Sequence, residues 1–247
     1  MSDNPLRRIF EAHQGRLINK WLHYFDVYHR HLQRFRGRRC TLVEIGVFHG
    51  GSLQLWREYL GPDARIIGVD INPHCANIVE PGCEILIGSQ SDRAFLRQLK
   101  ARCGPIDILI DDGGHRMEQL TISFQELYQA VAADGVYIAE DLHTCYWREY
   151  GGGFRHPYSF IEFAKLHIDQ LNARHSRDPG SFSVDAYTRS TASMHFYDSM
   201  LVMEKQNMPV PQQAVRGTPS YPDPNLEAMH RFNVAYNAHL QGQDQPE

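Results

Sequence analysis

The chain has 247 residues, and its content of 42% hydrophobic and 22% charged residues is ordinary for a globular protein, so disorder is not the default expectation. This length suits one α/β domain with added elements, or two small domains. The formal charge of −4 argues against a protein whose main task is to hold nucleic acid or another polyanion.

The five cysteines are scattered and include no C-x-x-C pair, so neither a disulfide framework nor a zinc knuckle is indicated. Reduced thiols fit a cytoplasmic protein best. No run approaches the roughly 18 apolar residues of a membrane helix, and the first five residues lack the pattern of a signal peptide. We therefore expect a cytoplasmic protein that binds neither a membrane nor nucleic acid.

Apolar residues recur at helical spacing from Ile9 to Phe35, which predicts an amphipathic helix that Gly15 could interrupt. We assign this helix to an N-terminal segment over residues 1–38. The predicted strands that follow are Leu42–Val47, Ile66–Val69, Ile85–Ile87, Ile106–Ile110 and Val136–Ala139. The predicted helices between them are Ser52–Leu60, Asp92–Lys100 and Glu118–Ala132. This alternation predicts a doubly wound, mostly parallel α/β sheet.

The pattern changes after a glycine run at residues 151–153. The predicted elements beyond it are a helix at Tyr158–Asn172 and β-like runs at Ser181–Tyr187 and Met194–Glu204, the latter interrupted at Asp198-Ser199. Residues 206–224 hold five prolines, which is typical of an extended arm, and a final amphipathic helix follows. We therefore expect one core domain over residues 39–205, followed by an arm and helix over 206–247.

A glycine turn, Gly46-Val47-Phe48-His49-Gly50-Gly51-Ser52, comes directly after the first predicted strand. Glycines allow positive φ and a close approach of the backbone to a ligand. The pattern is not the G-x-G-x-x-G of dinucleotide sites, so we do not expect NAD to bind. Glu44, two residues before the turn, suits a cationic amine such as that of S-adenosylmethionine. Tight packing alone is the alternative explanation of such a turn.

The second predicted strand leads into Asp70, where an acid can accept hydrogen bonds from both hydroxyl groups of a ribose. The third leads into Ser89 and Gln90, which suit the edge of an adenine ring. Asp92 could also contact the ligand, but we expect it to be the N-cap of the next helix. The predicted cofactor-binding residues are Glu44, Gly46, Gly50, Ser52, Asp70, Ser89, Gln90 and Asp111.

Acidic residues also follow the last two predicted strands, in Asp111-Asp112-Gly113-Gly114-His115 and in Glu140-Asp141. Because the carboxyl ends of parallel strands meet at one edge of a sheet, these side chains should converge. Several carboxylates with an imidazole suggest a hard metal ion beside a base, and therefore an enzyme. The structural alternative is that Asp-Asp-Gly is only a turn and that Glu140-Asp141 caps the next helix.

The glycine turn, Asp70 and the two acidic strand ends resemble those of class I S-adenosylmethionine-dependent methyltransferases. A narrower resemblance is to the metal-dependent sugar O-methyltransferases of macrolide antibiotic biosynthesis, of the mycinamicin and tylosin type. The segments that carry it are Trp21–Phe25, Glu44–Val47, Gly50–Leu53, Asp111–His115 and Glu140–Thr144. The resemblance implies a Rossmann-like sheet of seven strands, ending in a reversed hairpin at Met194–Glu204. Gly114 and Cys145 depart from the family, whose members often have serine at both positions.

Carried over by motif, the resemblance implies that Asp112, Glu140 and Asp141 bind Mg²⁺ and that His115 is the general base. His143 is a rival for the catalytic role. The implied reaction moves a methyl group from S-adenosylmethionine to a hydroxyl group of a deoxysugar, or of a related vicinal diol, in a natural product.

Three alternatives remain: a catechol-type acceptor, a cephalosporin-hydroxylase-type tailoring protein with the same core, and a non-catalytic scaffold. We also expect a homo-oligomer, because the aromatic N-terminal helix and the proline arm offer more apolar surface than the core needs.

Overall fold

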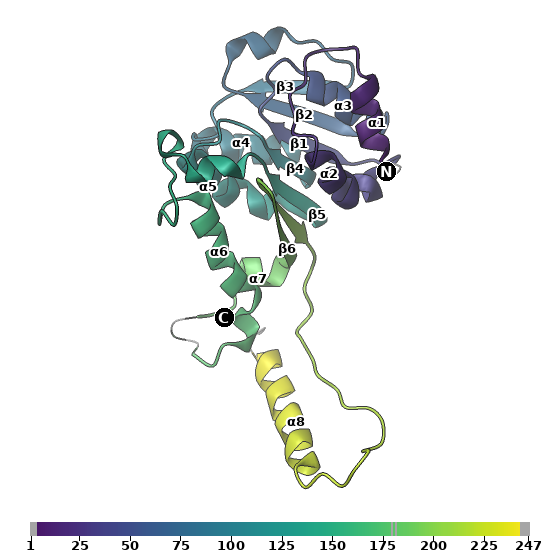
Figure 1. The fold of residues 1–247 in the computed structure, drawn as a ribbon, viewed down its shortest axis with the longest axis vertical. Coiled ribbons are helices and arrows are strands. Elements are labelled where there is room, and N and C mark those ends of the chain that lie inside the picture. Colours follow the sequence, from purple (N-terminus) through teal and green to yellow (C-terminus); the bar gives the residue numbers. More distant parts are fainter. Residues whose placement is uncertain (1–3, 179, 181, 243–247) are drawn as a thin grey trace.

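The computed structural model describes residues 4–178, 180 and 182–242, and its centre is a single sheet of seven strands (Figure 1). The strands are β1 (Thr41–Ile45), β2 (Arg65–Asp70), β3 (Cys83–Ile87), β4 (Ile106–Asp111), β5 (Val131–Ala139), β6 (Thr191–Tyr197) and β7 (Met200–Lys205). Their order is β3-β2-β1-β4-β5-β7-β6. Strands β1 to β5 run parallel, whereas β7 is antiparallel to β5 and β6. This confirms the predicted mostly parallel sheet of seven strands.

Helices cover both faces of this sheet. One face carries α1 (Pro5–Ala12), α2 (Tyr24–Leu32) and α3 (Gly51–Leu60), and the other carries α4 (Arg93–Cys103), α5 (Met117–Leu127) and α6 (Phe160–Leu171). Successive side chains of a strand point to opposite faces. Leu42 therefore packs in the apolar cluster beneath α1, α2 and α3, and Val43 packs in the cluster beneath α4, α5 and α6. Both are fully buried.

Shorter helical elements complete the core. They are α7 (Ala186–Ser190) and the 3₁₀ turns η1 (Gln33–Phe35), η2 (Pro73–Asn77), η3 (Tyr128–Ala130), η4 (Leu142–Tyr146), η5 (Arg148–Tyr150) and η6 (Ala173–His175). From β1 the chain winds first towards β3 and then, from β4 onward, in the opposite direction. Open α/β sheets bind ligands outside the strand ends at such a reversal, so the fold predicts a site beyond β1 and β4.

The N-terminal helix is divided, because residues 13–23 leave the helical path between α1 and α2. At Gly15 the chain lies so close to α3 that a Cβ there would overlap the Gln54 side-chain oxygen. That oxygen accepts a hydrogen bond of 2.8 Å from the backbone N–H of Arg16. Tertiary contact with α3 thus replaces the helical hydrogen bonds expected across this stretch. We call residues 13–23 the N-terminal strap.

Two boundaries differ from the sequence prediction. The predicted helix Glu118–Ala132 ends at Leu127, because the chain turns through η3 and Val131 already pairs with Ile106 of β4. The strand predicted at Ser181–Tyr187 is wrong at its C-terminal end. There Asp185 accepts a hydrogen bond of 2.8 Å from the backbone N–H of Thr188 and starts α7. Ser181 lies outside the described residues.

The predicted hairpin is confirmed as β6 and β7, joined at Asp198-Ser199. Beyond β7 an extended arm carries the chain away from the sheet to α8 (Leu226–Gly242), which stands apart from the core (Figure 1). In α8 Leu240 is buried, but Phe232 and Val234 are exposed. The division into residues 1–38, 39–205 and 206–247 stays a prediction. None of the helices among the described residues has the length and apolar character needed to cross a membrane.

Candidate active site

Two cavities open at the carboxyl edge of the sheet. The first, of about 360 Å³, lies beyond β1, β2 and β4, where the strand order reverses. Its walls include Gly46, Asp70, Ser89, Gln90, Asp112, His115 and Asp141. The second, of about 390 Å³, is lined by Asn19, Lys20, Trp21, Leu22, Tyr24, Asp112, Glu140, Asp141 and His143. Asp112 and Asp141 belong to both walls, so they stand where the two cavities meet.

The glycine turn forms one side of the first cavity. Gly46 has φ of 100°, and a Cβ there would overlap the backbone oxygen of Asp112. Only glycine therefore lets β1 and β4 end so close together. Asp70 fixes the turn, since its Oδ2 accepts hydrogen bonds from the N–H groups of Val47 at 2.8 Å and Phe48 at 3.0 Å. A carboxylate has lone pairs beyond these bonds, so Asp70 can still accept from a ligand.

Four predicted cofactor residues, Glu44, Gly50, Ser52 and Asp111, lie outside the walls of the first cavity. Glu44 is fully buried behind the turn, where it accepts hydrogen bonds from Ser52 Oγ at 2.6 Å and Trp56 Nε1 at 3.0 Å. Burial raises the pKa of Glu44. The structure thus places Glu44 and Ser52 against each other, instead of in the wall where direct contact with a cofactor was expected.

Asp111 is also fully buried and supports the wall from behind. Its carboxylate accepts a hydrogen bond of 2.9 Å from Gln90 Nε2 and another from Ser123. Gln90 Oε1 in turn accepts from the N–H of Gly114 at 2.7 Å. Asp111 therefore orients Gln90, and Gln90 orients the Gly113-Gly114 segment that leads to His115. Asp92, as expected, is the N-cap of α4, accepting from the N–H of Ala94 at 2.8 Å.

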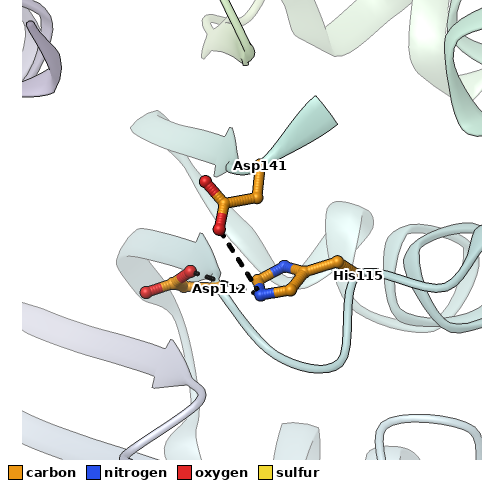
Figure 2. Close-up of side chains that lie close together, drawn as sticks. All are labelled: Asp112, His115 and Asp141. Carbon is orange, nitrogen blue, oxygen red and sulfur yellow. Dashed lines mark ion pairs between the residues drawn. The ribbon is translucent and has the colours of Figure 1, made fainter. Parts of the chain in front are cut away.

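The acidic centre where the cavities meet consists of Asp112, His115 and Asp141 (Figure 2). His115 Nε2 lies 3.6 Å from Asp141 Oδ2 and 4.0 Å from Asp112 Oδ1. One ligand atom from each residue lies within 4.8 Å of the other two. His115 and Asp141 both have left-handed backbones, with φ of 54° and 55°. Such strain in non-glycine residues persists where the surrounding structure imposes it, most often at functional sites.

The other ring nitrogen of His115, Nδ1, is buried and has no hydrogen-bond partner among the described residues. Buried polar atoms without a partner are uncommon and mark places where a ligand or a reaction supplies the missing interaction. Paired carboxylate oxygens are the donors that hard divalent cations prefer. The side chains of Asp112 and Asp141 therefore fit a divalent metal ion, with the His115 imidazole next to it.

Glu140, the third predicted metal ligand, faces a different set of partners. It is fully buried, accepts a hydrogen bond from the Tyr28 hydroxyl group and lies 2.9 Å from Lys20 Nζ. Burial and the charge of Asp112 raise its pKa. Glu140 is absent from the group of described residues whose ligand atoms converge on one point. The structure thus brings Asp112 and Asp141 together with His115, while Glu140 pairs with a lysine.

Lys20 belongs to none of the sequence motifs. Its side chain is 3% exposed, and its Nζ lies 2.6 Å from Asp112 Oδ2 and 3.7 Å from Glu44 Oε1. Burial disfavours the charged lysine, but the carboxylates of Asp112 and Glu140 outweigh burial and raise its pKa. Tyr24 was missed as a polar partner too: its hydroxyl group donates to Asp141 Oδ1 at 2.8 Å. The sequence did offer one signal for Lys20. Several acids were expected at one edge of the sheet, and buried acids need a cation nearby.

His143, the rival catalytic residue, belongs to the second cavity. Its Nδ1 is hydrogen-bonded to Ser199 Oγ at 2.6 Å. Its ring packs against Trp21, with centroids 5.7 Å apart, and against Trp147 at 4.8 Å. These contacts hold the ring among aromatic side chains at the rim. The Nδ1 of His143 also lies 4.0 Å from Asp141 Oδ1, so both histidines face Asp141, whereas His115 faces Asp112 as well.

Known proteins resemble this chain in sequence and in fold. Residues 43–142 match the family model described as a methyltransferase domain. The chain is 33% identical over 198 residues to an 8-demethyl-8-alpha-L-rhamnosyl tetracenomycin-C 2'-O-methyltransferase of Streptomyces olivaceus, covering 76% of this chain and 52% of that protein. It is 31% identical over 202 residues to demethylmacrocin O-methyltransferase of Streptomyces fradiae, covering 76% and 51%.

Among solved structures, the chain is similar to the MycE methyltransferase of the mycinamycin biosynthetic pathway in complex with Mg, SAH and mycinamycin VI. The TM-score is 0.72 at 26% identity, covering 93% of this chain and 58% of that one. The chain spans about half the length of the curated relatives it matches. These similarities confirm the resemblance expected from the sequence motifs.

Proposed function

Because the chain carries a methyltransferase domain and its homologues are sugar O-methyltransferases, we propose that it moves a methyl group from S-adenosylmethionine to a hydroxyl group of a glycosylated natural product. The observation that carries this proposal is the pair of cavities that meet at Asp112 and Asp141. Methyl transfer needs two substrates held end to end with a base at their junction. The two cavities supply a place for each substrate, and His115 lies at their junction.

The first cavity suits S-adenosylmethionine. Gly46 brings the backbone close to the ligand, and Asp70 has carboxylate lone pairs free for the ribose hydroxyl groups. Ser89 and Gln90 offer polar groups to the adenine edge. Glu44 supports this wall from behind the turn, where it accepts hydrogen bonds from Ser52 and Trp56. S-adenosylmethionine supplies the electrophilic methyl group when bound.

The second cavity suits the acceptor sugar, and Asp112 and Asp141 would hold a magnesium ion at its inner end. Such an ion acidifies neighbouring hydroxyl groups, whose own pKa lies far above neutrality. His115 Nε2, which faces Asp112 and Asp141, accepts the proton of the attacking hydroxyl group as general base. Tyr24 orients Asp141 through its hydrogen bond.

Transfer of a labelled methyl group tests this proposal. We expect labelled S-adenosylmethionine to modify glycosylated polyketides but not the matching aglycones, because the sugar supplies the hydroxyl group. Excess chelator should stop transfer, and added Mg²⁺ should restore it. Transfer to aglycones, or full transfer in chelator, would contradict the acceptor class or the role of the metal.

We also infer that the chain forms a homo-oligomer. Helix α8 stands away from the core and exposes Phe232, at 50%, and Val234, at 72%. A second copy would cover this surface. Light scattering at micromolar concentration should give a mass above that of one chain. Replacing Phe232 and Val234 with aspartate should lower that mass. A monomeric mass for the unchanged chain would refute the inference. The cytoplasmic location expected from the cysteines stays a prediction.

A further inference from the structure

Lys20 makes contacts that the proposed reaction does not use. Its ammonium group lies within 4 Å of carboxylates from three different strand ends: Glu44 of β1, Asp112 after β4 and Glu140 after β5. Its side chain is 3% exposed, so these acids replace water around the charge. The lysine belongs to none of these strands. It comes from the N-terminal strap, the irregular segment between α1 and α2.

The contacts of Lys20 overlap with those that a metal ion needs. Lys20 Nζ is bound to Asp112 Oδ2 at 2.6 Å, while Asp112 Oδ1 faces His115. Both oxygens of Glu140 are engaged, one by Lys20 and the other by the Tyr28 hydroxyl group. A divalent cation between Asp112, Glu140 and Asp141 must therefore take oxygens that the ammonium group now holds. Two cations so close together would repel each other strongly at a site with little water.

The strap that carries Lys20 also forms much of the acceptor cavity. Asn19, Trp21 and Leu22, its neighbours along the chain, line that cavity. Trp21 and Leu22 are 54% and 51% exposed, and Trp21 packs against the His143 ring across the cavity. The other end of the strap is fixed to α3 through Arg16 and Gln54. A movement of Lys20 would thus change the cavity wall without detaching the strap.

From these contacts we propose that Lys20 is an internal cation that exchanges with the divalent metal. Metal binding expels the ammonium group from Asp112 and Glu140, frees Glu140 as a ligand and moves residues 19–22 at the acceptor cavity. The proposal rests on the proposed function only in requiring that a divalent metal bind at Asp112. It makes metal binding a condition for the final shape of the acceptor site.

Hydrogen–deuterium exchange on the whole chain tests the movement directly. We expect saturating Mg²⁺ to raise amide exchange in peptides covering residues 17–23, with no such rise in peptides from β6 and β7. Asp112→Asn should abolish this response. Magnesium that binds in the unchanged protein but leaves exchange in the strap unaltered would overturn the proposal, whatever the variants do. Absence of Mg²⁺ binding itself would instead refute the proposed metal function.

Calorimetry with Mg²⁺ tests the competition. Lys20→Met removes the competing charge and should tighten Mg²⁺ binding at least tenfold, whereas Lys20→Arg keeps a cation and should not. Lys165→Met is the matched control, since Lys165 is half exposed and pairs with Glu162 on α6. Equal or weaker Mg²⁺ binding by Lys20→Met would show that the lysine supports the ligands instead of competing for them. If Lys20→Met fails to fold, exchange in the unchanged protein decides alone.

Discussion

The acids at the carboxyl edge of the sheet form two tiers that differ in depth. The inner tier, Glu44, Asp111 and Glu140, is fully buried, and protein side chains occupy its oxygens. The outer tier, Asp70, Asp112 and Asp141, is half-buried and lines the first cavity. Asp111 and Asp112 are neighbours in sequence, as are Glu140 and Asp141. One step along the chain past the end of a strand therefore separates a structural carboxylate from one that can meet a ligand.

The two tiers depend on each other. The inner acids hold the residues that shape the site, as Asp111 holds Gln90 and Glu140 holds Lys20. The outer acids face the first cavity, although Lys20 and Tyr24 also bond to Asp112 and Asp141. We expect substitutions in the outer tier to damage chemistry and substitutions of Glu44 and Asp111 in the inner tier to damage stability. The predictions below test this division, from the largest expected effect to the smallest.

Asp112→Asn should reduce turnover to background, because the amide removes a metal-binding charge where the two cavities meet. Folding should survive, since the side chain is only half-buried and keeps its shape. Methyl transfer and Mg²⁺ calorimetry measure the loss, and thermal unfolding provides the control. Retained turnover with lost Mg²⁺ binding would mean that the outer tier acts without metal.

His115→Ala should reduce turnover by about 10²–10⁴-fold, the usual cost of losing a general base. Affinity for Mg²⁺ and S-adenosylmethionine should change little, because the imidazole is assigned to neither. His143→Ala is the matched control, since this ring contacts Ser199 and two tryptophans at the rim. The fall in turnover at acidic pH reports protonation of the general base. If that fall persists in His115→Ala but disappears in His143→Ala, His143 is the general base instead of His115.

Glu44→Ala should act on stability more than on chemistry. It leaves the buried donors Ser52 and Trp56 without their acceptor and removes one carboxylate beside Lys20. We expect a loss of about 2–4 kcal/mol in the free energy of unfolding, the cost of a broken buried polar pair. Urea unfolding measures this loss. Affinity for S-adenosylmethionine should stay within about tenfold of normal, because Glu44 lies outside the walls of the first cavity. A larger loss of affinity with normal stability would restore Glu44 to direct cofactor contact.

Lys205 on β7 lies away from both tiers and offers a test of stability alone. Its side chain is buried, and burial lowers its pKa from the usual 10.5 to about 8. Between these two pH values the unfolded chain binds more protons than the folded one, so the free energy of unfolding should rise with pH. Lys205→Met should remove about 1–3 kcal/mol of this rise, without affecting turnover at pH 7. Denaturant unfolding at pH 7.5 and 10 checks it, and an unchanged slope would contradict it.

Much of the fold could be predicted because its signals are local. The apolar runs before Asp70, Asp112 and Glu140 are short and flanked by turns, which is typical of buried parallel strands. All five parallel strands lie where these runs predict them. The divided N-terminal helix was not predictable in the same way. Its spacing stays helical through residues 17–22, and only contact with Gln54 shows why the chain leaves the helix.

The candidate site could be predicted only in part. The sequence placed Asp112, His115 and Asp141 at one edge, and the structure brings their ligand atoms within 4.8 Å of each other. The family resemblance implied the same role for Glu140 and Asp141, but it could not show that Glu140 faces Lys20 and Tyr28. Which way a carboxylate turns after a strand depends on what packs beneath it. Those partners come from elsewhere in the chain.

By itself, then, the sequence determined the order of strands and helices, the glycine turn and the edge at which the acids gather. These features follow from side-chain periodicity and from the backbone freedom of glycine, both of which operate over a few residues. Only the tertiary structure decided which acids are buried, which face a cavity and which cation compensates them. Lys20 lies 92 residues from Asp112 and 120 from Glu140 along the chain, yet its ammonium group contacts both. Electrostatic pairing of buried charges depends on distance in space, and no local pattern in the chain encodes that distance.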